Sequence, residues 1–135
     1  MFLKVGNASH RILLADDDRV VRRLLTSIVE KEGYTVVATE DGRGAYRILQ
    51  SDADFSAAIF DMLMPNLDGL EVIRYMRTEK RLMRIPVLMI TSELDLNFTA
   101  ASFAAGATVF LPKPFTTAQF QTTFKILVNE RKAAA

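Results

Sequence analysis

The sequence predicts an α/β protein built on a doubly wound, five-stranded parallel sheet with helices on both faces. Short apolar runs alternate along the chain with longer segments of helical period, which is the pattern of βα units on a parallel sheet. Most of the apolar runs lack in/out alternation, so we expect both faces of the sheet to be covered. Gly33 and Gly106 each follow a predicted helix and lead into a predicted strand, where a left-handed residue favours glycine.

The strands are predicted from short segments rich in apolar, β-branched and aromatic residues. They cover residues 11–15, 35–39, 57–61, 86–91 and 108–112. The helices are predicted from apolar residues that recur at helical spacing, such as Val20, Leu24 and Ile28 in the first. They cover residues 19–32, 44–50, 69–78, 96–105 and 118–131. Asp18 is the expected N-cap of the first helix.

The composition limits the class of protein. The 135 residues make one domain of ordinary size, predicted at 10–131 with flanking tails at 1–9 and 132–135. Lys and Arg number 17 against 16 Asp and Glu, and the net charge of +1 gives no general attraction to nucleic acid or to an anionic membrane. The apolar runs are too short to span a bilayer. A chain without cysteine suits the reducing cytoplasm, which is the location we expect.

Polar side chains follow four of the predicted strands. Right-handed crossovers give the strand order 2-1-3-4-5 of flavodoxin-like sheets, in which ligands bind beyond the strand ends at the switch point between strands one and three. Asp16 and Asp17 follow the first strand, and we therefore expect them next to Asp61, which ends the third. Thr91 and Lys113 stand at the ends of the fourth and fifth strands. The topology thus gathers these residues into one site.

Three carboxylates in one crevice repel each other, and a divalent cation is the usual remedy. Oxygen ligands without thiolates or converging histidines favour Mg²⁺, which can also take a phosphate oxygen as a ligand. Asp61 is then the expected nucleophile for a phosphoryl group, because carboxylates form aspartyl phosphates. Lys113 would pair with one phosphoryl oxygen and the Thr91 hydroxyl would donate a hydrogen bond to another.

Each of these residues also has an ordinary structural explanation. Adjacent acidic residues are most often helix N-caps, and an aspartate before a turn is common. Thr91 and Ser92 could cap the next helix, and a single lysine is usually solvated. The functional interpretation rests on the combination, because all of these residues fall at adjacent strand ends.

At these positions the chain resembles the receiver domain of two-component response regulators. The matching residues are Leu13, Leu14, Ala15, Asp16 and Asp17, then Asp61, Met64, Pro65, Asp68 and Gly69, then Thr91 and Ser92, then Lys113, Pro114 and Phe115. The resemblance spans roughly residues 11–128. It implies phosphotransfer from a histidine kinase phosphohistidine to Asp61, and a small residue, here Ser92, that leaves room for the phosphoryl group. It also implies that Mg²⁺ is held by Asp16, Asp17, Asp61 and the backbone carbonyl of Leu63.

The resemblance further implies a switch. Phe110 matches the aromatic residue that turns inward as the threonine, here Thr91, moves to the phosphoryl group, reshaping the face of helix four, strand five and helix five. Phe110 has no hydroxyl, so it can report its position only by burial. A cis peptide bond is expected between Lys113 and Pro114, since X-Pro bonds are where cis is tolerated.

The implied partners are a sensor histidine kinase or a phosphotransfer protein and, downstream, a protein partner or fused output domain. Homodimer formation through the face of helix four, strand five and helix five is an open alternative. We expect no direct binding to nucleic acid or to a membrane.

Two surface features are expected to be structural. A basic stretch is predicted to be a solvated face; it consists of Arg74, Arg77, Lys80, Arg81 and Arg84. Phe98 and Phe103, in an alanine-rich segment, are predicted to be core residues, although an exposed apolar patch there would mark a partner site.

We therefore predict a phosphoacceptor signalling domain, not an enzyme beyond its own phosphorylation and autodephosphorylation. We expect it to be either a stand-alone receiver or a fragment of a larger regulator or hybrid kinase. A Mg²⁺-dependent phosphohydrolase with an aspartate nucleophile is one alternative. Leu63 argues against it, because it stands two residues after Asp61, where such an enzyme needs an acid. A receiver-like scaffold that binds partners without phosphorylation is the other alternative, although its acidic site would normally be incomplete.

Overall fold

The computed structural model describes residues 10–92 and 96–134, and these form five strands and five helices in alternation. The strands are β1 Arg11–Ala15, β2 Thr35–Thr39, β3 Ala57–Asp61, β4 Val87–Thr91 and β5 Val109–Pro112. The helices are α1 Arg19–Lys31, α2 Gly42–Ser51, α3 Gly69–Thr78, α4 Leu96–Ala105 and α5 Thr117–Ala134. All strand pairs are parallel, in the order β2-β1-β3-β4-β5, which confirms the predicted fold and topology.

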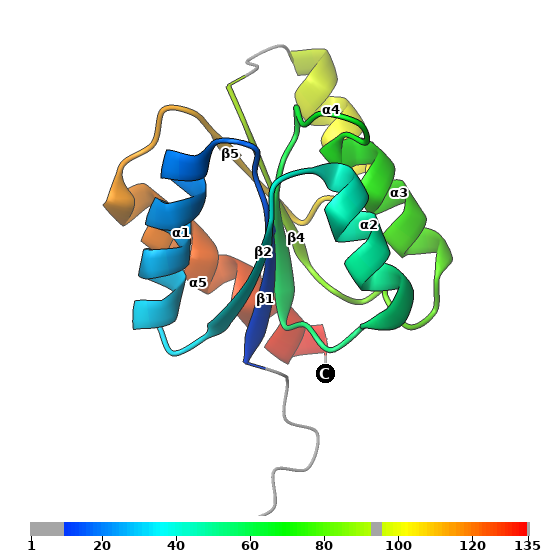
Figure 1. Ribbon diagram of the computed structural model, residues 1–135, viewed down its shortest axis with the longest axis horizontal. Coiled ribbons are helices and arrows are strands. Elements are labelled where there is room, and N and C mark those ends of the chain that lie inside the picture. The colour runs from blue at the N-terminus through cyan, green and yellow to red at the C-terminus, as the bar shows by residue number, and fades with distance from the viewer. Residues whose placement is uncertain (1–9, 93–95, 135) are drawn as a thin grey trace, which may run out of the picture.

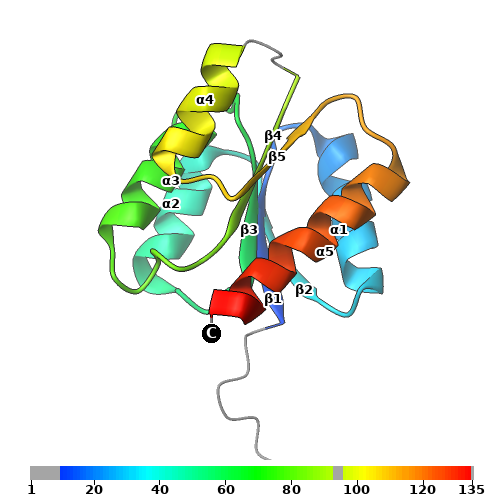
Figure 2. The same ribbon diagram turned by 180° about the vertical axis from the view of Figure 1, so that it is seen from behind.

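The sheet lies between two helical layers. Helices α1 and α5 cover one face and α2, α3 and α4 cover the other, as Figures 1 and 2 show from opposite sides. Each layer encloses its own apolar cluster, one around Ile12, Ile59 and Phe120 and the other around Leu13, Phe60 and Ile73. Strands β3 and β4 are buried along their whole length, because side chains on both of their faces meet a helical layer.

The element boundaries follow the capping residues. Asp18 caps α1 as predicted, since its carboxylate accepts hydrogen bonds from the Val20 and Val21 amides. Helix α2 begins at Gly42, so the predicted start at residue 44 was wrong. The reason is the cap, because Asp41 accepts a hydrogen bond from the Gly44 amide.

The other boundary differences are small. Helix α5 runs from Thr117 to Ala134 instead of 118–131, α1 ends at Lys31 instead of residue 32, and α2 ends at Ser51 instead of residue 50. Strands β4 and β5 each begin one residue after the predicted start. Such shifts are usual where terminal hydrogen bonds decide the limit of an element.

Arg77 corrects the prediction of a fully solvated basic face. Its guanidinium donates to the carbonyl oxygens of Gly106 at 2.8 and 3.2 Å, Ile85 at 2.9 Å and Met83 at 3.0 Å. Burial lowers its pKa. Gly106 has the predicted left-handed backbone, with φ 115°. Arg77 therefore joins the end of α3 to the segment before β4 and to the turn between α4 and β5, while the other basic residues of the stretch are exposed.

The apolar character of α4 has a different outcome from the one predicted. The Phe103 side chain is 49% exposed, so its assignment to the core was wrong. Its ring lies 6.5 Å from the ring of Phe110, which is half-buried against the layer of α2, α3 and α4. The side chain of Phe98 lies outside the described residues. Phe103 and Phe110 thus form a partly exposed aromatic pair on α4 and β5.

Candidate functional site

The register of the sheet places the candidate residues at one edge. Ala15 of β1 is paired with Phe60 of β3, so Asp16 and Asp61 follow the paired residues side by side. These strand ends, with those of β4 and β5, lie at the upper edge of the sheet in Figure 1. The expectation that the four segments meet is therefore correct.

The three aspartates form one acidic cluster. Asp16, Asp17 and Asp61 each offer a carboxylate oxygen, and these oxygens lie within 4.8 Å of one another. Asp16 and Asp61 are buried, whereas Asp17 is exposed. Oδ1 of Asp16 accepts a hydrogen bond from the Asp18 amide at 2.8 Å, but its buried Oδ2 has no hydrogen-bond partner among the described residues.

This donor set fits a hard divalent cation. It consists of carboxylate oxygens, the chain has no cysteine, and its single histidine, His10, precedes β1 at the opposite end of the sheet. A buried carboxylate oxygen that accepts no hydrogen bond is costly unless a cation lies nearby. The observed cluster is therefore consistent with the predicted Mg²⁺ ligands Asp16, Asp17 and Asp61.

Lys113 is the cation of the site. Its Nζ donates to Oδ2 of Asp61 at 3.1 Å and lies 3.8 Å from Oδ2 of Asp16. Burial lowers the pKa of Lys113, but the charges of Asp16 and Asp61 outweigh this effect, so the pKa is raised and the ammonium stays charged. One ammonium thus faces two buried carboxylates, which leaves a net negative site.

The buried carboxyl groups have raised pKa values. Burial raises the pKa of Asp16 from 3.8 to about 6, against the opposing hydrogen bond from the Asp18 amide and with a further rise from the charge of Asp61. Burial also raises the pKa of Asp61, although the charge and hydrogen bond of Lys113 oppose the rise. Perturbed carboxyl groups that gather in one place are typical of functional sites.

The loop that follows β3, residues 62–68, is joined to the site by a backbone contact with Asp61. The Leu63 amide donates to Oδ1 of Asp61 at 3.3 Å, and the Gly69 amide donates to the Met62 carbonyl at 3.0 Å. Asp68 and Glu71 form a capping box at the start of α3. The Leu63 side chain is 51% exposed. Asp61 is therefore both a turn residue, as the structural alternative proposed, and a member of the acidic cluster.

The remaining predicted residues lie at the ends of β4 and β5. Thr91 is fully buried, and its carbonyl accepts a hydrogen bond from the Lys113 amide at 2.8 Å. Ser92 is exposed directly after it. The peptide bond between Lys113 and Pro114 is cis, as expected. Their roles, like those of Leu63 and Phe110, stay predictions.

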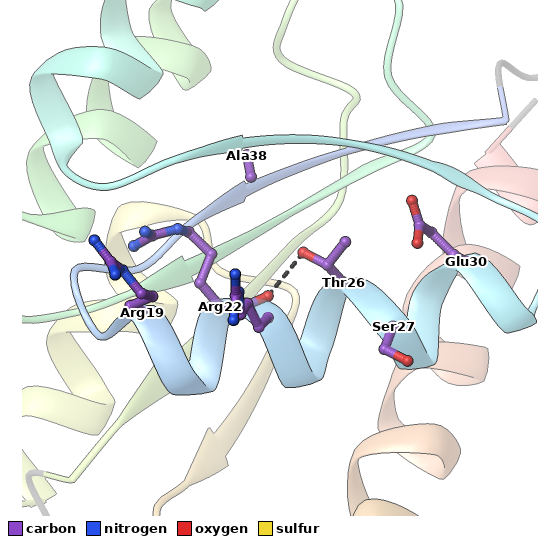
Figure 3. A pocket seen from close by; sticks show the side chains of 7 residues that line it. Arg19, Arg22, Thr26, Ser27, Glu30 and Ala38 are labelled. Atoms are coloured by element: carbon purple, nitrogen blue, oxygen red, sulfur yellow. Dashed lines mark hydrogen bonds between the residues drawn. The ribbon is translucent and has the colours of Figure 1, made fainter.

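A basic hollow beside the site was not predicted. It has a volume of about 420 Å³ between α1 and β2 and is lined by Arg19, Arg22, Arg23, Thr26, Ser27, Glu30 and Ala38. Figure 3 shows Arg19 and Arg22 on the side of α1 that faces Ala38. Nη1 of Arg22 donates to the carbonyl of Asp16 at 2.6 Å, which fixes the backbone of the cluster. The spacing of these arginines at i, i+3 and i+4 was the available signal.

Comparison with known proteins identifies the family. A family model described as the response regulator receiver domain matches residues 12–125. The chain belongs to this family. Response regulator MprA of Mycolicibacterium vanbaalenii is 37% identical over 119 residues, which cover 88% of the chain and 50% of that protein. MprA of Mycobacterium ulcerans is 37% identical over 124 residues, covering 92% of the chain and 52% of that protein. The receiver chain spans about half the length of the curated relatives it matches.

Solved receiver structures share the fold. Chemotaxis response regulator CheY4 of Vibrio cholerae superposes with a TM-score of 0.81 at 28% identity, covering 90% of this chain and 99% of that chain. The receiver domain of sensor histidine kinase PA1611 from Pseudomonas aeruginosa gives 0.80 at 26% identity, with coverage of 90% and 99%. That structure is described with a magnesium ion coordinated in its active site cleft. Within the described part of this receiver, none of the helices combines the length and apolar character that crossing a bilayer requires.

Proposed function

We propose that this receiver domain accepts a phosphoryl group on Asp61 from the phosphohistidine of a sensor histidine kinase or phosphotransfer protein. The observation that carries the proposal is the buried Asp61 carboxylate, 3.1 Å from the Lys113 ammonium, within a cluster with Asp16 and Asp17. A histidine kinase partner and a cytoplasmic location suit the family and a chain without cysteine.

In the proposed transfer, an Asp61 carboxylate oxygen forms a bond to phosphorus while the phosphorus–nitrogen bond to the histidine breaks. The electron pair of that bond leaves with the imidazole nitrogen, and an acyl phosphate remains on Asp61. Asp16, Asp17, Asp61 and the backbone carbonyl of Leu63 would hold Mg²⁺. When bound, Mg²⁺ neutralises the carboxylates and the phosphoryl oxygens, so that the two can approach.

The other side chains would receive the transferred group. Lys113 would exchange its hydrogen bond to Asp61 for one to a phosphoryl oxygen, because a phosphoryl group carries more negative charge than the carboxylate it replaces. Thr91 would donate its hydroxyl to another phosphoryl oxygen. Ser92 and Pro114 would support this arrangement, Ser92 because its small side chain leaves space and Pro114 because it sets the backbone direction after Lys113.

Phosphorylation would then bias the face formed by α4, β5 and α5. The contact with Thr91 would favour an inward position of Phe110, and the aromatic pair of Phe103 and Phe110 would change its exposure. The altered face would bind a downstream protein partner, a fused output domain or a second copy of the receiver. We propose no direct contact of this domain with nucleic acid or with a membrane.

The test is the intact mass after incubation with Mg²⁺ and a small acyl-phosphate donor. We expect wild type to gain one phosphoryl group and Asp61→Asn to gain none, because the amide is a poor nucleophile. Asp52→Asn is a matched control at the opposite end of the sheet and is expected to react like wild type. Turnover of added phosphate esters would favour the phosphohydrolase instead. Mg²⁺ binding without phosphoryl uptake from the small donor or from a phosphorylated kinase would favour the scaffold.

A further inference from the structure

A side-chain contact joins the β2–α2 turn to the β3–α3 loop, beside the acidic cluster. Nδ2 of Asn66, in the β3–α3 loop, donates to Oδ2 of Asp41 at 3.0 Å. Oδ1 of the same carboxylate accepts the Gly44 amide at 2.8 Å and so caps α2. We name the contact between Asp41 and Asn66 the clasp. One carboxylate thus holds both the start of α2 and the tip of the loop.

The backbone around the clasp is closely fitted. Asn66 has φ 72°, and no other non-glycine residue in the described ranges has a positive φ. A Cβ added to Gly42 would lie 1.6 Å from the Leu67 carbonyl oxygen, so the loop rests directly on the first turn of α2. Asparagine tolerates the left-handed conformation better than most residues. The loop is therefore seated at one defined place.

The loop also reaches the site. It begins next to Asp61, and the Leu63 amide donates to Oδ1 of Asp61. The side chain of Leu63 is half exposed, so packing contributes little to holding this residue. A ligand supplied by a backbone carbonyl is oriented only by the path of the loop, since no side-chain rotamer can adjust it. The clasp is an anchor for that path.

We propose that Asp41 and Asn66 are positioning residues, which hold the β3–α3 loop so that the Leu63 backbone is ready to bind the metal. This inference rests on the proposed function for the role of Leu63. The clasp itself stands on the contacts between the two turns. Residues that orient a ligand without touching the metal commonly change its affinity by about 10- to 100-fold when they are replaced.

The test uses a swap of the two side chains. Asn66→Asp places a second carboxylate against Asp41, and Asp41→Asn on that background restores a hydrogen bond with the donor on the other residue. We expect Asn66→Asp to weaken Mg²⁺ binding about tenfold, and the double variant to recover most of the loss. Phosphorylation by a small acyl-phosphate donor should fall at limiting Mg²⁺ and recover at saturating Mg²⁺.

A second measurement needs neither metal nor phosphate. Hydrogen exchange of the Leu63 amide in excess chelator should be faster in Asn66→Asp and return toward the wild-type rate in the double variant. Asp52→Asn is the matched control, because Asp52 also accepts a nearby amide and a side-chain donor, and it should change neither measurement.

The outcomes separate the two hypotheses. Unchanged Mg²⁺ affinity and unchanged exchange of the Leu63 amide in Asn66→Asp would overturn the positioning role of the clasp. A double variant that does not recover Mg²⁺ affinity would overturn it as well. A wild-type protein that takes up neither Mg²⁺ nor a phosphoryl group would instead overturn the proposed function, and the exchange measurement would still decide whether the clasp positions the loop.

Discussion

The amino and carboxyl ends of the sheet differ in how their charged side chains are paired. At the amino end, Nη1 of Arg11 forms an ion pair with Asp52 at 2.9 Å and also donates to the Asp54 carbonyl at 3.0 Å. The guanidinium lies 4.6 Å from the centre of the Phe55 ring. At the carboxyl end, the single ammonium of Lys113 faces the clustered aspartates. Arg11 and Asp52 thus pair one charge with one at the amino end, whereas the carboxyl end has three clustered carboxylates and one ammonium.

The aspartates at the two ends of the sheet have pKa values that are shifted in opposite directions. At the amino end, the Asp54 amide and the guanidinium of Arg11 lower the pKa of Asp52. At the carboxyl end, burial raises the pKa values of Asp16 and Asp61. The fold therefore stabilises the charged form of Asp52 and disfavours the charged forms of Asp16 and Asp61, a perturbation that is typical of functional sites.

The largest expected effect follows removal of the cation at the carboxyl end. Lys113→Met should slow phosphorylation of Asp61 about 100-fold or more, because one donor to the developing charge is lost. The initial rate with a small acyl-phosphate donor measures this effect. Lys125→Met, an exposed lysine on α5, is the matched control. Equal rates in the two variants would show that Lys113 takes no part in the transfer.

The second effect is a pH dependence of stability in the metal-free protein. The folded pKa of Asp16, about 6, lies above its ordinary value of 3.8. Its stabilising contribution is therefore complete below the ordinary value and is lost as the pH rises through about 6. We expect the free energy of unfolding to fall by about 1 kcal/mol between pH 5 and pH 7.

Chemical denaturation in excess chelator at several pH values measures this slope. Asp16→Asn should remove most of it, while His10→Gln, which removes the only histidine, should keep it. A slope that is flat in wild type, or equally steep in Asp16→Asn, would contradict the assignment to Asp16.

The third effect separates stability from function at one residue. Asp16→Asn should raise the metal-free free energy of unfolding at neutral pH by about 1 kcal/mol, because it removes a desolvated charge. Its amide oxygen can still accept the Asp18 amide. The same variant should lose most of the stabilisation by added Mg²⁺, which thermal unfolding with and without Mg²⁺ measures. A variant less stable than wild type without metal would show that the carboxylate is structural.

The smallest effect belongs to the amino end. Asp52→Asn should lower the free energy of unfolding by about 0.5 kcal/mol, since each side chain of its ion pair with Arg11 is 31% exposed and solvent screens the pair. Denaturation at low and high salt measures the change. A large loss of unfolding free energy that high salt does not reduce would contradict the expectation that solvent screens this ion pair.

Much of the fold could be predicted because its signals are local. Strands β1, β2 and β3 and helices α3 and α4 have the predicted limits, since apolar runs mark the strands and Asp68 caps the start of α3. The start of α2 could not be predicted, because it depends on which backbone amide donates a hydrogen bond to the Asp41 carboxylate. Phe103 was misassigned for a related reason, because an alanine-rich helix gives no clear polar face.

The gathering of the candidate site could be predicted because the topology alone brings strand ends together. Asp16, Asp61 and Lys113 meet for that reason. Contacts made by long side chains could not be predicted, since the choice of partner depends on packing between distant segments. The hydrogen bonds from Arg22 to the Asp16 carbonyl and from Arg77 to the Gly106 carbonyl are of this kind.

The guanidinium of Arg77 also holds the carboxyl end of α4 in place. It fastens the turn after α4, through the Gly106 carbonyl, to the end of α3 and to the segment before β4. A Cβ added to Gly106 would lie 2.6 Å from Nε of Arg77, so the arginine side chain packs closely against this glycine. A displacement of α4 that keeps these hydrogen bonds would therefore pivot at the carboxyl end of the helix, and its amino end would move farthest.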